Sequence, residues 1–177
     1  TLTLGNLYFV PVDRAEAALT EAVSRDVQLE VFTNGVGDDA AWPTQAWGWD
    51  SRFSYLPMFL GHEYTLDQEK EARTAKIHDT KIYEYYNSEI LYHKKWLVSD
   101  GHTTIIGSYN LGRKSDSGDY EIAITMDSQE IASQAMEATE ADRQNSRVVP
   151  FEDAYMWYFD WSYRWMAGAE DYYHGMM

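Results

Sequence analysis

The stretch Tyr92–Asn110 reads Y-H-K-K-W-L-V-S-D-G-H-T-T-I-I-G-S-Y-N, and it predicts a β-hairpin. Two short runs rich in β-branched residues, W-L-V and T-T-I-I, flank an Asp-Gly pair of the kind that favours a tight turn. Side chains alternate along a strand, so His93 and Lys95 are expected on the same face of the first strand. The second strand should bring the run from Gly107 to Asn110 back beside them.

The side chains gathered by this hairpin suit the chemistry of a phosphodiester. A histidine can act as a nucleophile that carries a phosphoryl group. Ammonium, hydroxyl and carboxamide groups can donate hydrogen bonds to the non-bridging oxygens of the phosphate. An ordinary strand histidine and a solvated lysine would explain an isolated H-x-K pair. The whole spacing, H-x-K-x4-D followed by G-S-x-N, favours a site in which His93, Lys95 and Asn110 are catalytic and Gly107 and Ser108 bind substrate.

This spacing resembles the HKD signature of the phospholipase D superfamily, and the chain is most similar to the C-terminal half of bacterial cardiolipin-synthase-like proteins. The resemblance implies an α/β half-domain, in which a mixed β-sheet is flanked by helices on both faces. It also implies that Asp100 and Ser115 support the site and that Glu121 hydrogen-bonds a catalytic histidine of a partner half. Without the resemblance, Glu121 is a solvated residue before an apolar strand.

Only one HKD signature is present, because the sequences around His62 and His78 do not match it. In the superfamily two histidines act together: one attacks phosphorus to form a phosphohistidine, and the other protonates the leaving oxygen. The resemblance therefore implies a second HKD half, either in the same longer chain or in an identical subunit. A chain that opens with Thr1, close to a core strand, favours the longer chain.

The resemblance implies a phosphodiesterase or phosphatidyltransferase that acts on phospholipid. The alternative is a dimeric, single-HKD nuclease or nucleic-acid phosphodiesterase, and a third class is a non-catalytic interaction half. The net charge of −15 disfavours nucleic acid, which binds basic surfaces, although the same charge repels anionic lipid headgroups. A solvated acidic exterior that aids solubility explains the charge equally well.

Composition excludes several other classes. The chain has no cysteine, which excludes disulfides and thiolate metal sites, and its five histidines form no H-E-x-x-H pattern. We expect neither a cofactor nor a metal ion. No apolar run approaches the ~20 residues of a membrane span, so no transmembrane segment is expected. The resemblance implies a bacterial protein that is peripheral to the membrane.

Local patterns predict alternating strands and helices over the half-domain. A capping box at Asp13 predicts a helix to about Arg25, and Asp127 is expected to begin another helix. Residues 36–58 are expected to form a long loop, and residues 63–79 a partly helical segment. The strands are expected at about 7–10, 27–33, 81–86, 94–99, 103–107 and 119–126.

The half-domain is expected to span residues 1–150, followed by an aromatic-rich helix and tail over residues 151–177. The helix candidate, 151–166, is apolar nearly all round, which is typical of a helix buried between other elements. Trp and Tyr also suit the headgroup boundary, but the polar face lacks the lysines of interfacial helices. We therefore favour burial over membrane contact. His102, in the predicted turn, is expected to be a solvent-exposed loop residue.

Overall fold

The computed structural model describes residues 1–36, 42–86, 91–160 and 162–163. Its centre is a seven-stranded sheet in the order β6-β5-β4-β1-β2-β3-β7. Strands β1, β2 and β3 are parallel to one another, whereas β4, β5, β6 and β7 each pair antiparallel with their neighbours, so the sheet is mixed. The strands are β1 (Leu2–Gly5), β2 (Leu29–Asn34), β3 (Thr80–Tyr85), β4 (Trp96–Ser99), β5 (Thr103–Gly107), β6 (Ala123–Asp127) and β7 (Ser146–Val148).

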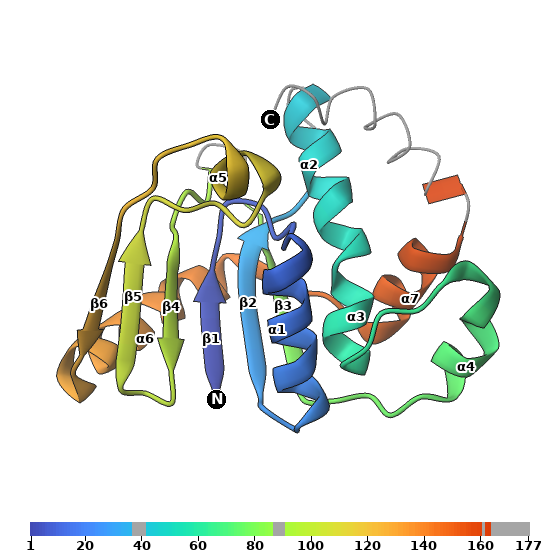
Figure 1. Cartoon of the computed structure of the whole chain (residues 1–177), viewed down its shortest axis with the longest axis horizontal. Helices are drawn as coiled ribbons and strands as arrows, with labels where there is room; N and C mark the ends of the chain where they lie inside the picture. Colours follow the sequence, from blue (N-terminus) through green and yellow to red (C-terminus); the bar gives the residue numbers. More distant parts are fainter. Residues whose placement is uncertain (37–41, 87–90, 161, 164–177) are drawn as a thin grey trace.

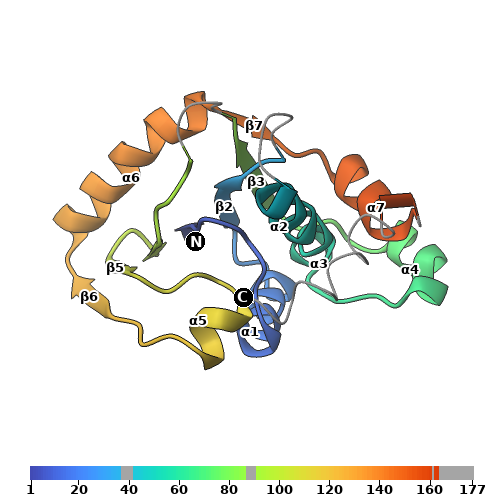
Figure 2. The ribbon, with the colours of Figure 1, turned by 90° about the horizontal axis from the view of Figure 1, so that it is seen from above.

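Helices cover both faces of this sheet (Figures 1 and 2). On one face lie α1 and α3, with α7 packed against α3, and on the other face lies α6. This arrangement confirms the predicted α/β fold with a mixed sheet between helices. The helices are α1 (Asp13–Ser24), α2 (Trp42–Phe53), α3 (Tyr55–Leu60), η1 (Leu66–Gln68), α4 (Glu69–Thr74), α5 (Arg113–Ser117), α6 (Gln129–Gln144) and α7 (Phe151–Phe159).

The larger core lies between the sheet and α1, α3 and α7. Alternation along β2 sends Leu29 and Val31 into this core, while Phe32 faces the other side and stacks on Tyr83 at 4.6 Å between ring centroids. In α7, Trp157 is only 4% exposed, so the burial favoured for the aromatic helix is confirmed for its described part. Residue 161 and residues 164–177 lie outside the described part of the chain.

The predicted hairpin is present, and its turn has the expected backbone. Asp100 and Gly101 have φ values of 51° and 63°, and the His102 N–H donates to the Ser99 carbonyl at 3.0 Å. Positive φ at both central residues matches the right-handed twist of paired strands, which explains the Asp-Gly pair. His102 is solvent-exposed, as expected for a loop residue.

The strand predicted at residues 7–10 is wrong, because the first strand is Leu2–Gly5. The apolar run L-Y-F-V instead crosses the end of the sheet as buried irregular chain. The Phe9 ring is fully buried, and its N–H donates to Ser51 Oγ at 3.0 Å rather than to a neighbouring strand. The segment is apolar because it is buried, as a strand would be. A side chain, rather than a neighbouring strand, satisfies the Phe9 N–H.

The long loop predicted at residues 36–58 is also wrong, because α2 and α3 occupy most of it. Gly48 and Pro57 conceal these helices, since both residue types interrupt helical patterns. Pro57 lies in the first turn of α3, where the lack of an N–H costs little. The first part of the predicted loop, residues 37–41, lies outside the described residues.

Two helix starts and one strand differ from the sequence expectations. The N-cap of α1 is Val12 rather than Asp13, and its side chain caps no backbone N–H. The N-cap of α6 is Ser128, whose hydroxyl accepts from the Ile131 N–H. Strand β7 was not expected; three residues without apolar alternation carry too little pattern to predict it. The partly helical character of 63–79 is confirmed by η1 and α4.

Strand β6 forms one edge of the described sheet, and its apolar residues are largely exposed. Ile124 pairs with Ile106 of β5, and their exposed fractions are 61% and 47%. Ile122, just before β6, is 71% exposed. This edge carries neither the lysine nor the proline that usually protects an edge strand.

A fully buried carboxylate joins β3 to α2 and β7. Glu84 accepts from Arg52 Nε at 2.7 Å and Nη2 at 2.9 Å, and from Arg147 Nη2 at 3.0 Å. The Arg52 guanidinium also lies over the rings of Trp49 and Trp157, at 4.6 and 4.2 Å from their centroids. Since an unpaired charge in this place would be costly, the network fixes how α2 and α7 pack on the sheet.

We expect Glu84→Ala to lower the free energy of unfolding by about 3–5 kcal/mol, because it leaves Arg52 buried without its counter-ion. The matched control is Glu140→Ala, which removes an exposed partner of Arg143 and should cost less than about 1 kcal/mol. Urea denaturation of both variants measures the difference. Equal losses would contradict a structural role for the buried carboxylate.

Candidate active site

The two adjacent lysines before β4 point in opposite directions. Lys94 donates to both carboxylate oxygens of Asp142 on α6, at 2.8 and 2.6 Å. Lys95 therefore lies on the other face of the sheet, and its ammonium donates to the His93 carbonyl at 3.2 Å. His93 is exposed and, like both lysines, precedes β4. The opposite directions of Lys94 and Lys95 separate a structural lysine from the candidate site lysine.

Gly107 brings the returning strand beside Lys95 and allows β6 to approach closely. Its N–H donates to the Lys95 carbonyl at 3.1 Å. A Cβ at this position would lie 2.5 Å from the Ile122 carbonyl oxygen, so a larger residue would push β6 away. The close approach of β6 is what carries Glu121 to the site.

Glu121 is the centre of a hydrogen-bonded group at this end of the hairpin. The Ser108 hydroxyl donates to its carboxylate, while the Ile122 N–H donates to Ser108 Oγ at 3.0 Å. Hydrogen bonds from Ser108 and then Ser115 lower the pKa of Glu121, and the charge of Lys95 lowers it further. Glu121 is therefore held as a carboxylate that can accept a proton or a hydrogen bond from a further group.

Lys95 has a lowered pKa, and partial burial is the main cause. The Glu121 carboxylate opposes this effect by raising the pKa. A partly desolvated ammonium interacts more strongly with an anion than a fully hydrated one, because less water must be displaced on binding. Lys95 is thus placed to bind a phosphate oxygen.

Ser115 links this group to Asn110. Its hydroxyl accepts from the Asn110 N–H at 3.1 Å. The side-chain oxygen of Asn110 is buried and has no hydrogen-bond partner in the described part of the chain. A buried acceptor without a partner is unusual and calls for an explanation, such as an absent donor. The structure thus connects Lys95, Gly107, Ser108, Glu121, Ser115 and Asn110.

Two buried asparagines that the sequence analysis missed hold the site segments. Asn34 accepts from the Tyr92 N–H at 2.8 Å and donates to the Tyr92 carbonyl at 2.8 Å, next to His93. Asn6 donates to the Tyr109 carbonyl at 3.2 Å and accepts from the Leu111 N–H at 3.1 Å, on either side of Asn110. Their position in the sequence could have revealed them, since each asparagine stands at the end of an apolar strand, β1 or β2.

Asp100 is not close to these residues. It lies in the turn at the far end of the hairpin, roughly 16 Å along the strand from Lys95 at about 3.3 Å per residue. Its place in that turn agrees with a supporting role only. His102, beside it, lies 2.5 Å from the Asp127 carboxylate, at the same far end.

Within the described residues, no group of three or more His, Asp or Glu side chains is arranged to hold a metal ion. None of the helices described is long and apolar enough to cross a membrane.

These features define an α/β domain that carries an exposed histidine and a hydrogen-bonded cluster of polar side chains where strands β4, β5 and β6 begin or end. Residues 1–143 match the family described as cardiolipin synthase, PLD-like domain. The chain therefore belongs to this family, which confirms the resemblance drawn from the HKD spacing. Family membership supports a phosphodiesterase or transferase activity. No curated protein sequence matches the chain.

Several solved structures share the fold. Nuc from Salmonella typhimurium, described as a phospholipase D family member, is 15% identical, with a TM-score of 0.59 over 84% of this chain and 80% of that one. NucT from Helicobacter pylori is 14% identical, with a TM-score of 0.55 over 82% and 79%. The phosphatidylserine synthase of Haemophilus influenzae Rd KW20 is 13% identical, with a TM-score of 0.62 over 84% of this chain but only 33% of the synthase. At these identities the likeness concerns the fold alone.

We predict that Asn34→Ala loosens the segment that carries His93, because the buried N–H and carbonyl of Tyr92 lose their partner. The free energy of unfolding should fall by about 1–3 kcal/mol, and the Tyr92 amide should exchange faster with solvent. Asn145→Ala, which removes an exposed bond to the Ala141 carbonyl, is the control and should leave Tyr92 exchange unchanged. Unaltered exchange of the Tyr92 amide in the Asn34 variant would show that the two Asn34 hydrogen bonds do not hold this segment.

Ser108→Ala should raise the pKa of Glu121 toward its ordinary range, because the carboxylate loses the hydrogen bond that lowers its pKa most. A titration of the side-chain carboxyl carbon by NMR measures the change. Ser117→Ala, which removes a hydroxyl bonded to the Arg113 carbonyl, should leave the titration where it is. A Glu121 titration that does not move in the Ser108 variant would show that the bond has no electrostatic effect.

Proposed function

We propose that this domain is one half of a phosphodiesterase or phosphatidyltransferase that acts on phospholipid through a phosphohistidine on His93. The observation that carries the proposal is the hydrogen-bonded group joining Glu121, Ser108, Ser115 and Asn110 beside Lys95. This group lies at the end of the hairpin from which His93 projects. Membership of the cardiolipin synthase PLD-like family supports the reaction type.

In the first step, a His93 ring nitrogen attacks phosphorus, and the bond from phosphorus to the leaving alcohol breaks. Lys95 and the Asn110 carboxamide stabilise the negative charge on the non-bridging oxygens. The leaving oxygen takes a proton from a histidine of the second half. In the second step, water or an acceptor alcohol attacks phosphorus, its proton passes to that second histidine, and the bond to His93 breaks.

Glu121 has a specific part in this scheme. Its bonds within the described residues run to Ser108 and Ser115, on the same chain. The remaining lone pairs of the carboxylate can accept from the imidazole of the second half, which fixes its tautomer and stabilises its charged form. A single chain therefore supplies one nucleophile and the orienting acid for the other histidine.

The second half can come from the same longer protein or from an identical subunit. The chain spans about a third of the Haemophilus synthase, as expected for one half of a longer protein. It spans about four-fifths of Nuc and of NucT, which agrees with a stand-alone subunit. This second relation also supports the alternative function, a dimeric single-HKD nuclease or nucleic-acid phosphodiesterase.

Charge favours lipid over nucleic acid as the substrate. The net charge of −15 opposes an extended polyanion, whose affinity depends on many cationic contacts and the release of counterions. A single phosphodiester needs only the local group around Lys95. Lipid is therefore preferred to nucleic acid as the proposed substrate because the domain has to bind one phosphate instead of many.

We expect His93→Asn to abolish turnover of a chromogenic phosphodiester by the complete two-half assembly, because the nucleophile is lost. Lys95→Ala should lose most of the activity, since a phosphate oxygen loses its cationic partner. His102→Asn and Lys81→Ala are matched controls, because both residues are exposed and lie away from the site. Full activity in the His93 variant would end the proposal.

We further expect the assembly to turn over phosphatidylglycerol vesicles faster than it degrades DNA or RNA, assayed side by side at low and moderate salt. A second HKD half can alter the charge balance, so the complete assembly must be used. Strong nuclease activity that falls steeply with salt, without lipid turnover, would promote the alternative.

A further inference from the structure

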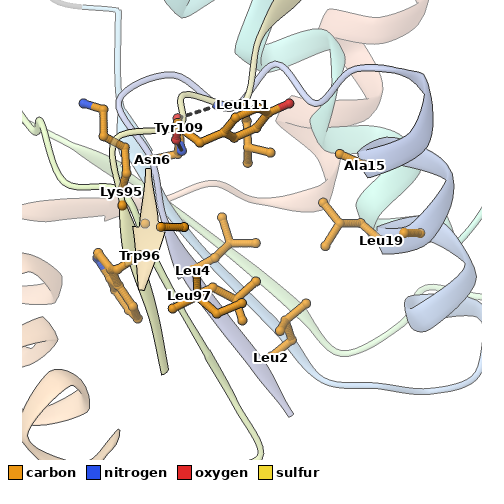
Figure 3. Close-up of a pocket in the computed structure, with 15 residues that line it drawn as sticks. Leu2, Leu4, Asn6, Ala15, Leu19, Lys95, Trp96, Leu97, Tyr109 and Leu111 are labelled. Atoms are coloured by element: carbon orange, nitrogen blue, oxygen red, sulfur yellow. Dashed lines mark hydrogen bonds between the residues drawn. The ribbon is translucent and has the colours of Figure 1, made fainter. Parts of the chain in front are cut away.

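An apolar pocket of about 380 Å³ begins at Lys95 and Gly107 and extends along the sheet away from the site (Figure 3). Its floor is a row of side chains paired across three strands: Leu4 pairs with Leu97, and Leu97 pairs with Ile105. Paired residues share a face, so this row lies on the face to which Lys95 belongs. Lys95 is the one charged residue among those described as lining the pocket.

Helix α1 forms one wall of the pocket, and small side chains on this wall leave the pocket open. Ala15, Ala18 and Leu19 of α1 line the pocket, and the two alanines occupy less of it than larger side chains would. Ala18 is exposed even though it lines an apolar surface. Leu111, which follows the site residue Asn110, also lines the pocket, as do Lys95 and Gly107. The pocket is therefore continuous with the candidate site.

A second cleft of about 510 Å³ lies on the other side of the loop that carries Asn110. Its lining differs in chemistry, since it includes Asn110, Arg113, Lys114 and Ser115 together with Trp47. Leu111 lines both spaces, so the loop separates them. A phosphate held by Lys95 and Asn110 would thus have an apolar space on one side and, on the other, a space lined by charged, aromatic and apolar side chains together.

A phosphodiester has two ester arms, and these two spaces differ in the way the arms of a phospholipid differ. In a nucleic acid both arms are polar sugars, whereas in a phospholipid one arm carries acyl chains and the other a polar head group. We propose that the pocket between α1 and β4–β5 holds part of an acyl chain of the substrate, with the head group on the side of Asn110. This inference rests on the proposed function and extends it to the binding of the apolar arm. The pocket volume falls in the range of small-molecule sites.

The chain-length dependence of activity tests this inference. In the complete assembly, kcat/KM for short diacyl phosphatidylglycerols below their micelle concentrations should rise about fourfold for each added methylene until the pocket is full, following ~0.8 kcal/mol per buried methylene. Ala18→Phe should fill the pocket and flatten this rise. Turnover of a small chromogenic phosphodiester should be unchanged in the same variant, because that substrate has no acyl chain.

Ala17→Phe is the matched control, because Ala17 is exposed on the same helix but does not line the pocket. It should keep the wild-type dependence on chain length. An unchanged rise in Ala18→Phe would overturn the inference. A loss of subunit or half association in Ala18→Phe, seen by analytical ultracentrifugation, would also overturn it, because the pocket would then be filled by the second half.

A binding measurement separates this inference from the proposed function. Calorimetry of a lysophosphatidylglycerol series with the His93→Asn assembly should show affinity that rises with chain length and is reduced by adding Ala18→Phe. This result would stand even if the assembly hydrolyses no phosphodiester, in which case the proposed function fails and the pocket assignment remains. Binding that ignores chain length would overturn the pocket assignment alone.

Discussion

Asn6 and Asn34 close the two adjacent parallel strands β1 and β2, and each holds a segment of the site through paired backbone hydrogen bonds. A side-chain amide can donate and accept at once, so it can replace the ladder partner that an irregular segment lacks. The segments around Tyr92 and Asn110 leave the sheet at this point, and both need such a partner to remain buried. The positions of His93 and of the loop that carries Asn110 therefore depend on the side-chain amides of Asn34 and Asn6.

The hairpin and its neighbours could be predicted from the sequence because each rule acted locally. The Asp100-Gly101 pair predicts the tight turn, and both residues have the positive φ values that such a turn needs. The common face of His93 and Lys95 stays a prediction from strand alternation. The separate role of Lys94 could not be read in this way. Its partner, Asp142, is 48 residues away on a helix, and only the folded sheet brings them together.

The errors in the sequence analysis arose where tertiary burial replaced local pattern. The run around Phe9 has the composition of a strand, but the Phe9 N–H donates to a helix side chain, and the Leu7 carbonyl at its start bonds to the end of β2. Helix α2 was hidden by Gly48, yet Arg52 on it is fixed by the buried Glu84. The Phe9–Ser51 hydrogen bond and the Arg52–Glu84 ion pair both join residues far apart in the sequence. Neither leaves a periodic pattern in its own segment. The assembly of Ser108, Ser115 and Glu121 into one group likewise needed the β5–β6 pairing.

The exposed edge at β6 has a consequence for the behaviour of the domain in solution. Strand β6 presents an edge that other chains could extend by backbone pairing, and the exposed side chains of Ile124 on it, of Ile122 just before it and of Ile106 on the neighbouring β5 make this region apolar. The strong negative charge of the chain opposes such contact by mutual repulsion, which acts over a Debye length of about 8 Å at physiological ionic strength. Colloidal stability of the isolated domain therefore depends on ionic strength, and concentrated salt removes the repulsion that keeps one sheet edge away from the next.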